Sequence, residues 1–321
     1  MGAIGAISAM GAIGAWGAKR LRPERGAGGK RVEGAPPSES ERGWGPASIR
    51  KSAAIAVLLL LCPALAVAQS DLERARALYN AGEFEESIAA AMVAKKKTAA
   101  APSATLIAAR ARLERFRQKN DPEDLAAARA DLVLLNPRIL APQEIIEWQI
   151  GLGTALFLEN QVGPAAEMFT TVLLTARARL PVAEFDKLLE WWASTLSRVA
   201  EAQSGAARRD GYAAMLSAVR GELERDPLSR PMAYWVVVAA RGAGDIDGAW
   251  NAAVAGWIRA GAQPDGEQLR SDLDRFVTQT LIPERAQAST GQRLDAKPTL
   301  MEISALTDQW RAIGEQWRSP N

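Results

Sequence analysis

Residues 151–173 read GLGTALFLENQVGPAAEMFTTVL, and this stretch decides the fold that the sequence predicts. Apolar residues recur at intervals of three and four on both sides of a short polar segment, as in two helices joined by a turn. A small residue where two helices cross lets them approach closely, and a large residue from the next turn fills the remaining space. The positions that carry this pattern are Leu152, Gly153, Leu156, Ala165, Phe169 and Val172.

Three other stretches have the same order of helix, polar turn and second helix opened by small residues: 78–94 (LYNAGEFEESIAAAMVA), 120–137 (NDPEDLAAARADLVLLNP) and 240–257 (ARGAGDIDGAWNAAVAGW). Ser87, Ala126, Ala165 and Ala249 occupy matching positions, so successive units begin 39, 39 and 84 residues apart. The last interval leaves room for one more helix pair, at 182–202 and 205–225, which fits the pattern loosely. The chain therefore predicts an array of degenerate helical hairpins.

These stretches resemble tetratricopeptide repeats, a family in which a polar turn, often with Gly, follows a first helix with a small and a large residue. The second helix of that family carries Ala, an aromatic residue and Ala, as Ala165 and Phe169 do here. The resemblance implies an all-α fold, a right-handed helical-hairpin solenoid. The alternative is an irregular helical bundle, because short repeat matches are common in alanine-rich helices.

From Asp71 onward, Val, Ile and Thr nowhere alternate with polar residues as they would in a strand, and Pro or Gly falls between the helical segments. We expect the repeat domain to cover residues 69–265. Residues 266–321 hold two further helices, at 266–286 and 299–317, which we expect to cap the end of the array.

The first 68 residues differ in composition from the rest. Residues 1–51 are rich in Gly, Pro, Ser and Arg and do not read as folded protein, which suggests a start assigned too early. Residues 52–68 have the basic flank, short apolar run and A-x-A site of a secretory signal peptide, with cleavage after Ala68. A periplasmic or secreted protein without a membrane span follows from this reading. The alternative is a signal that is retained as an anchor.

The whole chain has 39 Lys and Arg, 37 Asp and Glu, no His and one Cys. The leader holds nine of the basic and four of the acidic residues, so the mature chain has 30 against 33, a net charge of −3. Without His, the sequence excludes Ser-His-Asp triads and histidine-based zinc or haem sites. We therefore expect no catalytic residue, no metal and no cofactor, and no nucleic acid partner for an exported protein.

In the repeat family, the first helices line a concave groove that takes a peptide or a partner domain. Carried onto this sequence, that geometry implies a partner-binding surface made of Arg76, Tyr79, Asn80, Glu147, Thr154, Tyr234 and Arg241. Trp191 and Trp192 are adjacent and point about 100° apart on a helix. They cannot both face one core, so we expect one of them at a groove or against the next repeat.

A second candidate surface is the segment 95–119, in which eight basic residues face only Glu114. Arg112, Arg115 and Lys119 share one helical face and predict a site for an anionic envelope component, such as a polymer, a lipid headgroup or an acidic partner segment. The alternative is an ordinary solvated face.

The function that the sequence favours is an exported, non-catalytic scaffold or adaptor for protein–protein interactions in the bacterial cell envelope. A glycan-binding or glycan-processing helical protein, using tryptophan platforms and a carboxylate, is an alternative. A structural subunit of an envelope complex is another.

Overall fold

The computed structural model describes residues 63–290 and 300–318, which form only helices and the turns that join them. The first hairpins are α2 (Pro63–Ala81) with α3 (Phe84–Ala94), α4 (Ala101–Lys119) with α5 (Pro122–Leu134), and α6 (Pro142–Leu158) with α7 (Val162–Arg177). Then come α8 (Val182–Glu201) with α9 (Gly205–Arg225), and α10 (Arg230–Ala243) with α11 (Ile246–Gly261). A short 3-10 helix, Pro137–Ile139, precedes α6.

The C-terminal part starts with α12 (Glu267–Phe276), which continues through a π-helical stretch, Val277–Leu281, into α13 (Ile282–Thr290). Pro283 lacks an N–H to donate to the preceding turn, and the wider π stretch ends two residues before it. The last helix is α14 (Leu300–Gln316). The predicted all-α class is confirmed. The predicted stretches 78–94, 151–173 and 240–257 each span the turn between two helices of one hairpin, whereas 120–137 contains a single α-helix, α5, because α4 already ends at Lys119. Residues 1–62, with the predicted leader and most of the signal segment, lie outside the described residues; the expected cleavage point at Ala68 falls within α2.

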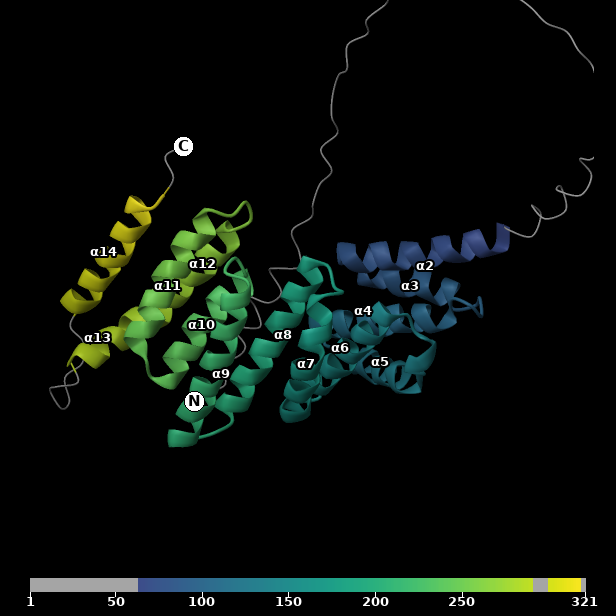
Figure 1. Ribbon diagram of the computed structural model, residues 1–321, viewed down its shortest axis with the longest axis horizontal. Helices are drawn as coiled ribbons and strands as arrows, with labels where there is room; N and C mark the ends of the chain where they lie inside the picture. Colours follow the sequence, from purple (N-terminus) through teal and green to yellow (C-terminus); the bar gives the residue numbers. More distant parts are fainter. Residues whose placement is uncertain (1–62, 291–299, 319–321) are drawn as a thin grey trace, which may run out of the picture.

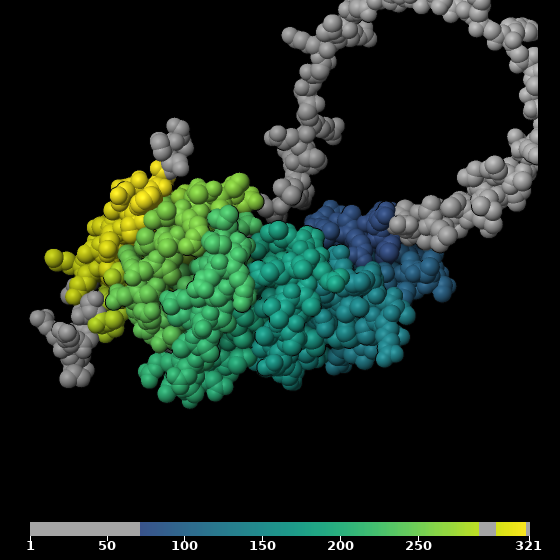
Figure 2. Space-filling model, viewed as in Figure 1, coloured from purple at the N-terminus to yellow at the C-terminus, as the bar shows by residue number. Residues whose placement is uncertain are grey.

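Neighbouring hairpins stack in the order of the sequence, as the colour gradient along the long axis shows (Figures 1 and 2). Each first helix contacts the first helix of the next hairpin, in the series α2, α4, α6, α8, α10 and α12. Each second helix packs against its own partner and against the first helix that follows it. The first helices thus form a continuous layer, as in an all-α repeat solenoid.

The hairpin turns have a common backbone feature, one residue with positive φ in each: Gly82, Asn120, Asn160, Gly205 and Gly244. Gly reaches this conformation without a steric penalty, and Asn tolerates it better than most residues. Second helices also receive side-chain caps. Asp121 accepts a hydrogen bond from the Glu123 amide, and Asp245 accepts one from the Gly248 amide.

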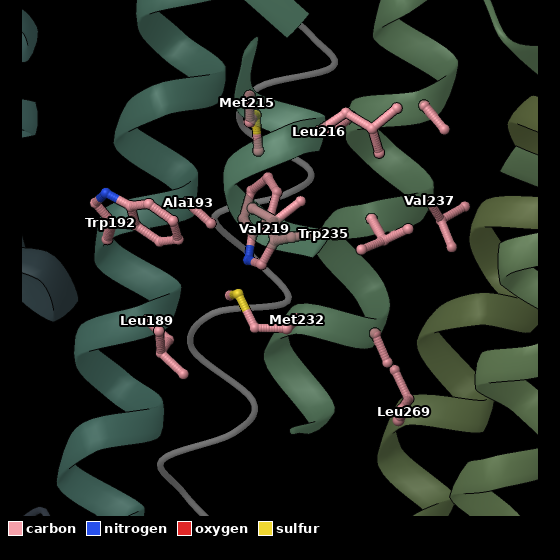
Figure 3. Packing of buried hydrophobic residues seen from close by; sticks show 14 of the residues in the cluster. Leu189, Trp192, Ala193, Met215, Leu216, Val219, Met232, Trp235, Val237 and Leu269 are labelled. Carbon is pink, nitrogen blue, oxygen red and sulfur yellow. The ribbon is translucent and has the colours of Figure 1, made fainter. Parts of the chain in front are cut away.

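The largest apolar core runs from α6 to the C-terminal helices, and smaller clusters lie under α2–α4 and α4–α6. Figure 3 shows part of this core, to which α8 contributes Leu189, α9 contributes Met215 and α10 contributes Met232. Trp191 and Trp192 are both buried, because α8 has neighbours on several sides. Trp191 packs on Phe157 of α6, whereas the Trp192 indole N–H donates to Thr170 of α7.

None of the described helices is long and apolar enough to cross a lipid bilayer.

Candidate functional site: a recess on the first helices

A recess opens on the layer of first helices, and it is lined only by α2, α4, α6 and α8. It holds about 400 Å³ of space that no atom fills, part of it open to solvent. Its lining is Tyr79, Arg110, Leu113, Glu114, Ile150, Gly151, Thr154, Glu184, Lys187, Leu188 and Trp191. The first helices of four successive hairpins therefore build one recess.

The lining residues repeat at helical spacing, which explains why they share a face. On α4 they begin at Arg110 and continue three and four residues later. On α8 they begin at Glu184 and continue at three, four and seven residues. These intervals place side chains in one stripe along a helix. Each stripe puts charged groups beside apolar ones, so the recess has an apolar floor and a charged rim.

An ion-pair network forms the polar side of this surface. The Arg110 guanidinium, whose side chain is 11% exposed, lies 3.0 Å from Glu147 Oε2 and 3.0 Å from Glu184 Oε2. Only the contact to Glu184 has hydrogen-bond geometry. Arg76 of α2 reaches the same network through Glu144, at 2.5 Å, and Glu147, at 3.4 Å. Removing one partner of a buried network leaves its other charges uncompensated, which costs about 3–5 kcal/mol. The network therefore fixes the relative positions of α2, α4, α6 and α8.

The ionisation of these groups follows from burial and from their neighbours. Burial raises the pKa of the Tyr79 hydroxyl well above its ordinary value, so the phenol stays protonated. Burial by itself lowers the pKa of Arg110, but Tyr79, Glu147 and Glu184 outweigh it and raise that pKa. Burial likewise raises the pKa of Glu184, but Arg110 and Lys187 prevail and lower it. The rim thus presents fixed charges and one neutral hydroxyl.

Two cations also lie over aromatic rings at this surface. The Arg110 guanidinium carbon is 4.6 Å from the centroid of the Tyr79 ring, and that of Arg117 is 4.8 Å from the Trp191 ring. A cation over an aromatic face contributes about 0.5–2 kcal/mol, depending on its exposure. These contacts hold the rings in place, so the recess is preorganised without a ligand.

The structure brings some of the predicted groove residues together and separates others. Tyr79 and Thr154 line the recess, and Arg76 and Glu147 belong to the adjoining network. Asn80 is exposed on α2 and does not line it. Tyr234 and Arg241 lie on α10, where Tyr234 packs edge-on against Phe276 and Arg241 pairs with Glu284 at 2.5 Å.

The basic segment 95–119 proves to be largely paired with acids from other helices. Arg112 pairs with Asp131, and Arg115 makes two hydrogen bonds to the buried Asp124, at 2.5 and 2.7 Å. Lys119 lies 2.7 Å from Glu85. These acids lie outside the segment, so its net charge of +7 in sequence is compensated in space. Lys96 is exposed, and it has no ion pair among the described residues.

Sequence reasoning missed Glu184, Lys187 and Arg110 as groove residues, although Arg110 was counted among the basic ones. The available signal was the stripe itself, with Glu184, Leu188 and Trp191 at intervals of four and three. That spacing is also typical of an ordinary core face, which is why the pattern alone did not single it out.

A second polar group lies further along the same layer, between α8 and α10. The Trp235 indole N–H donates to Glu190 Oε2 at 3.1 Å. Burial, with smaller contributions from Asp186 and Asp272, raises the pKa of Glu190 to about 7, although the hydrogen bond from Trp235 acts to lower it. Burial also raises the pKa of Asp186. Within residues 63–290 and 300–318, no cluster of acidic side chains has an arrangement that could hold a metal ion.

No protein-family model, no curated protein and no solved structure matches this chain.

Proposed function

We propose that this chain is an exported, non-catalytic scaffold of the tetratricopeptide type, whose first helices wind into a right-handed superhelix and bind a protein or peptide segment in the cell envelope. The observation that carries this proposal is the recess, because four first helices from successive hairpins converge on it. A solenoid that binds along its inner helices needs such a surface.

The chemistry of the recess favours an extended peptide. Its floor is apolar, with Leu113, Leu188 and Trp191, and its rim offers both signs of charge through Arg110, Glu184 and Lys187. Buried apolar anchors surrounded by fixed polar groups are the usual arrangement of a peptide-binding groove.

Photo-crosslinking in the producing cell tests the proposal. A benzoylphenylalanine in place of Lys187, at the half-exposed rim, is expected to give one discrete adduct that mass spectrometry can identify. The same residue in place of Leu174, which is exposed on the second helix α7, is expected to give none. Identical adducts from both positions, or none from Lys187, would contradict groove binding.

A matched pair of variants on α2 separates binding from folding. Tyr79→Ala removes a ring that lines the recess, whereas Asn80→Ala changes the adjacent exposed residue. The adduct from position 187 should weaken at least fivefold in the first variant and persist in the second, with thermal unfolding showing that both are folded. Loss of the adduct in both would point to a general effect on α2.

The glycan alternative has less support, because the tryptophans that would serve as platforms are mostly interior. Trp191, Trp192 and Trp235 are buried, and Trp317 alone is exposed among the tryptophans that the structure describes. Stacking on sugar rings requires an accessible aromatic face. A structural subunit would use the same recess permanently, and the mass of the purified native complex distinguishes it from a transient adaptor.

A further inference from the structure

A separate surface lies where second helices end and the chain passes to the next hairpin, which we call the inter-hairpin edge. Near the N-terminal end of the array, this edge carries five exposed large apolar side chains and two exposed basic ones. We call this set the inter-hairpin patch: Met92, Val93, Val133, Leu134 and Ile139, with Lys96 and Arg138. Leu134 is 84% exposed. Contiguous apolar side chains exposed in this way are typical of a surface that meets another body.

Ion pairs show that the two parts of the patch lie at neighbouring helix ends. Lys95, at the end of α3, lies 3.4 Å from Asp131 in the last turns of α5, so the ends of these two helices are neighbours. Lys97 lies 3.1 Å from Asp71, which ties the α3–α4 connection to the early part of α2. The patch therefore spans the ends of two second helices beside the beginning of the first helix.

The charges on the patch are basic. Lys96 and Arg138 are exposed, and neither has an ion pair in the part of the chain that the structure describes. The opposite edge, at the hairpin turns, carries exposed acids instead, among them Glu83, Glu86 and Asp121. The two edges thus differ in charge and in apolar content, and the inter-hairpin patch combines exposed apolar side chains with two basic residues that have no ion pair among the described residues.

The position of the patch in the chain indicates what covers it. Residues 53–61 read AAIAVLLLL, a long apolar run that ends two residues before Pro63, where α2 begins. Because α2 is a first helix, it begins at the inter-hairpin edge. Figure 1 shows the start of α2 and the α3–α4 connection at the same end of the molecule. If this segment is retained as an anchor, the alternative named in the sequence analysis, it holds the start of α2 at the bilayer.

We propose that the inter-hairpin patch rests on the surface of an anionic phospholipid bilayer. The five apolar side chains enter the boundary between headgroups and acyl chains, and Lys96 and Arg138 lie against the lipid phosphates. Apolar side chains flanked by Lys and Arg are the usual composition of such a surface. Each basic residue near an anionic bilayer strengthens partitioning roughly fivefold at physiological ionic strength. This surface is distinct from the recess, which lies on the first-helix layer.

An environment-sensitive fluorophore on the full chain tests the proposal directly. The single native thiol is removed by Cys62→Ser, and one new thiol is introduced by Leu134→Cys in the patch or by Met301→Cys as a control. The two sites have matched exposures, 84% and 82%, and Met301 lies at the start of α14, away from the inter-hairpin patch. The label is nitrobenzoxadiazole, and the vesicles contain phosphatidylglycerol and phosphatidylcholine in equal parts.

We expect a blue shift and a severalfold gain in emission at position 134 when vesicles are added, and neither at position 301. A label that does not respond at 134, or that responds equally at both positions, overturns the proposal. A response at 134 that appears without vesicles as the protein concentration rises means that a second copy covers the patch, and this also overturns it.

Charge variants test the anionic component. Lys96→Gln with Arg138→Gln should weaken vesicle partitioning roughly 25-fold, since two basic residues are lost. The control, Arg209→Gln with Arg220→Gln, removes the same net charge from exposed positions on α9. It should change vesicle partitioning little. Equal losses in both variants, or equal binding to pure phosphatidylcholine vesicles, would overturn the assignment of Lys96 and Arg138 to lipid phosphates.

Discussion

At the scale of single residues, Glu190 is a carboxyl whose pKa the fold raises to near neutral. Its carboxylate accepts a hydrogen bond from Trp235, but burial together with Asp186 and Asp272 raises its pKa from 4.5 to about 7. A raised carboxyl pKa means that the folded state holds the proton more tightly than the unfolded chain does. Glu190 therefore destabilises the folded protein when the pH is high enough to ionise it.

Glu190→Gln should stabilise the protein at alkaline but not at acidic pH. Below the unfolded pKa both states are protonated, and glutamine mimics the neutral acid. As the pH rises towards 7, the unfolded chain ionises first and the wild type loses stability, whereas the variant does not. We expect the variant to gain on the order of 1–3 kcal/mol at about pH 8 and close to nothing at about pH 4.5. Urea unfolding at both pH values measures the difference.

Glu224→Gln, at an exposed position on α9, is the control and should show a much smaller difference between the two pH values. If Glu190→Gln has the same effect at both pH values, the carboxyl does not titrate in the folded protein near neutral pH.

At the scale of helices, close crossings depend on residues without a side chain. A Cβ added to Gly153 of α6 would lie 2.8 Å from Cε1 of Phe169 in α7. Phe169 is fully buried and stacks on Trp191, with ring centroids 6.3 Å apart, so it has little room to move. Gly153 of the first helix therefore lies directly against Phe169 of the second. Gly221 in α9 differs, because a Cβ there would meet nothing within 4 Å.

These two glycines should respond in opposite directions to the same substitution. Alanine in place of glycine inside a helix gains about 1 kcal/mol from backbone entropy. At Gly153 we expect a net loss of about 1–2 kcal/mol, since overpacking a rigid core costs about 1–3 kcal/mol. At Gly221 we expect a gain of about 0.5–1 kcal/mol. Denaturant unfolding of Gly153→Ala and Gly221→Ala measures both, and a stabilised Gly153→Ala would show that the α6–α7 crossing is loosely packed.

At the scale of the whole molecule, the stability of each hairpin comes mainly from its contacts with the adjacent hairpins of the array. Each hairpin contacts mainly the hairpins before and after it, and α14 ends the series. Trp310 is the only buried residue of that helix, packed edge-on against Trp250 at 5.6 Å and donating to Asp274. In an array with nearest-neighbour contacts, a terminal unit can open while the rest stays folded.

Trp310→Ala should therefore release α14 without unfolding the repeats. We expect amide hydrogen exchange to rise at least tenfold in 300–316 and to remain unchanged in α4–α8, as read by mass spectrometry. Trp317→Ala, at the exposed end of the same helix, should have little effect. Faster exchange throughout the chain would mean that the array unfolds as one cooperative unit.

The sequence by itself determined the elements of this fold. The spacing of apolar residues predicts the helices, and Gly82, Gly205 and Gly244 indicate three of the five hairpin turns. The other two depend on Asn120 and Asn160, which adopt positive φ less readily than Gly and so give a weaker signal. These features are local, because helix periodicity and turn conformation depend on residues close together in the chain.

Only the tertiary structure decided which charges meet and which side chains share a surface. Arg112, Arg115 and Lys119 look unpaired along the sequence, yet they face Asp131, Asp124 and Glu85 from other helices. Likewise, Tyr79 and Glu184 lie in one recess although more than one hundred residues separate them. Ion pairs and grooves in a helical array form between hairpins, so they depend on the offset and angle at which neighbours stack. Many distant side chains set that geometry together, and the spacing within any one helix does not contain it.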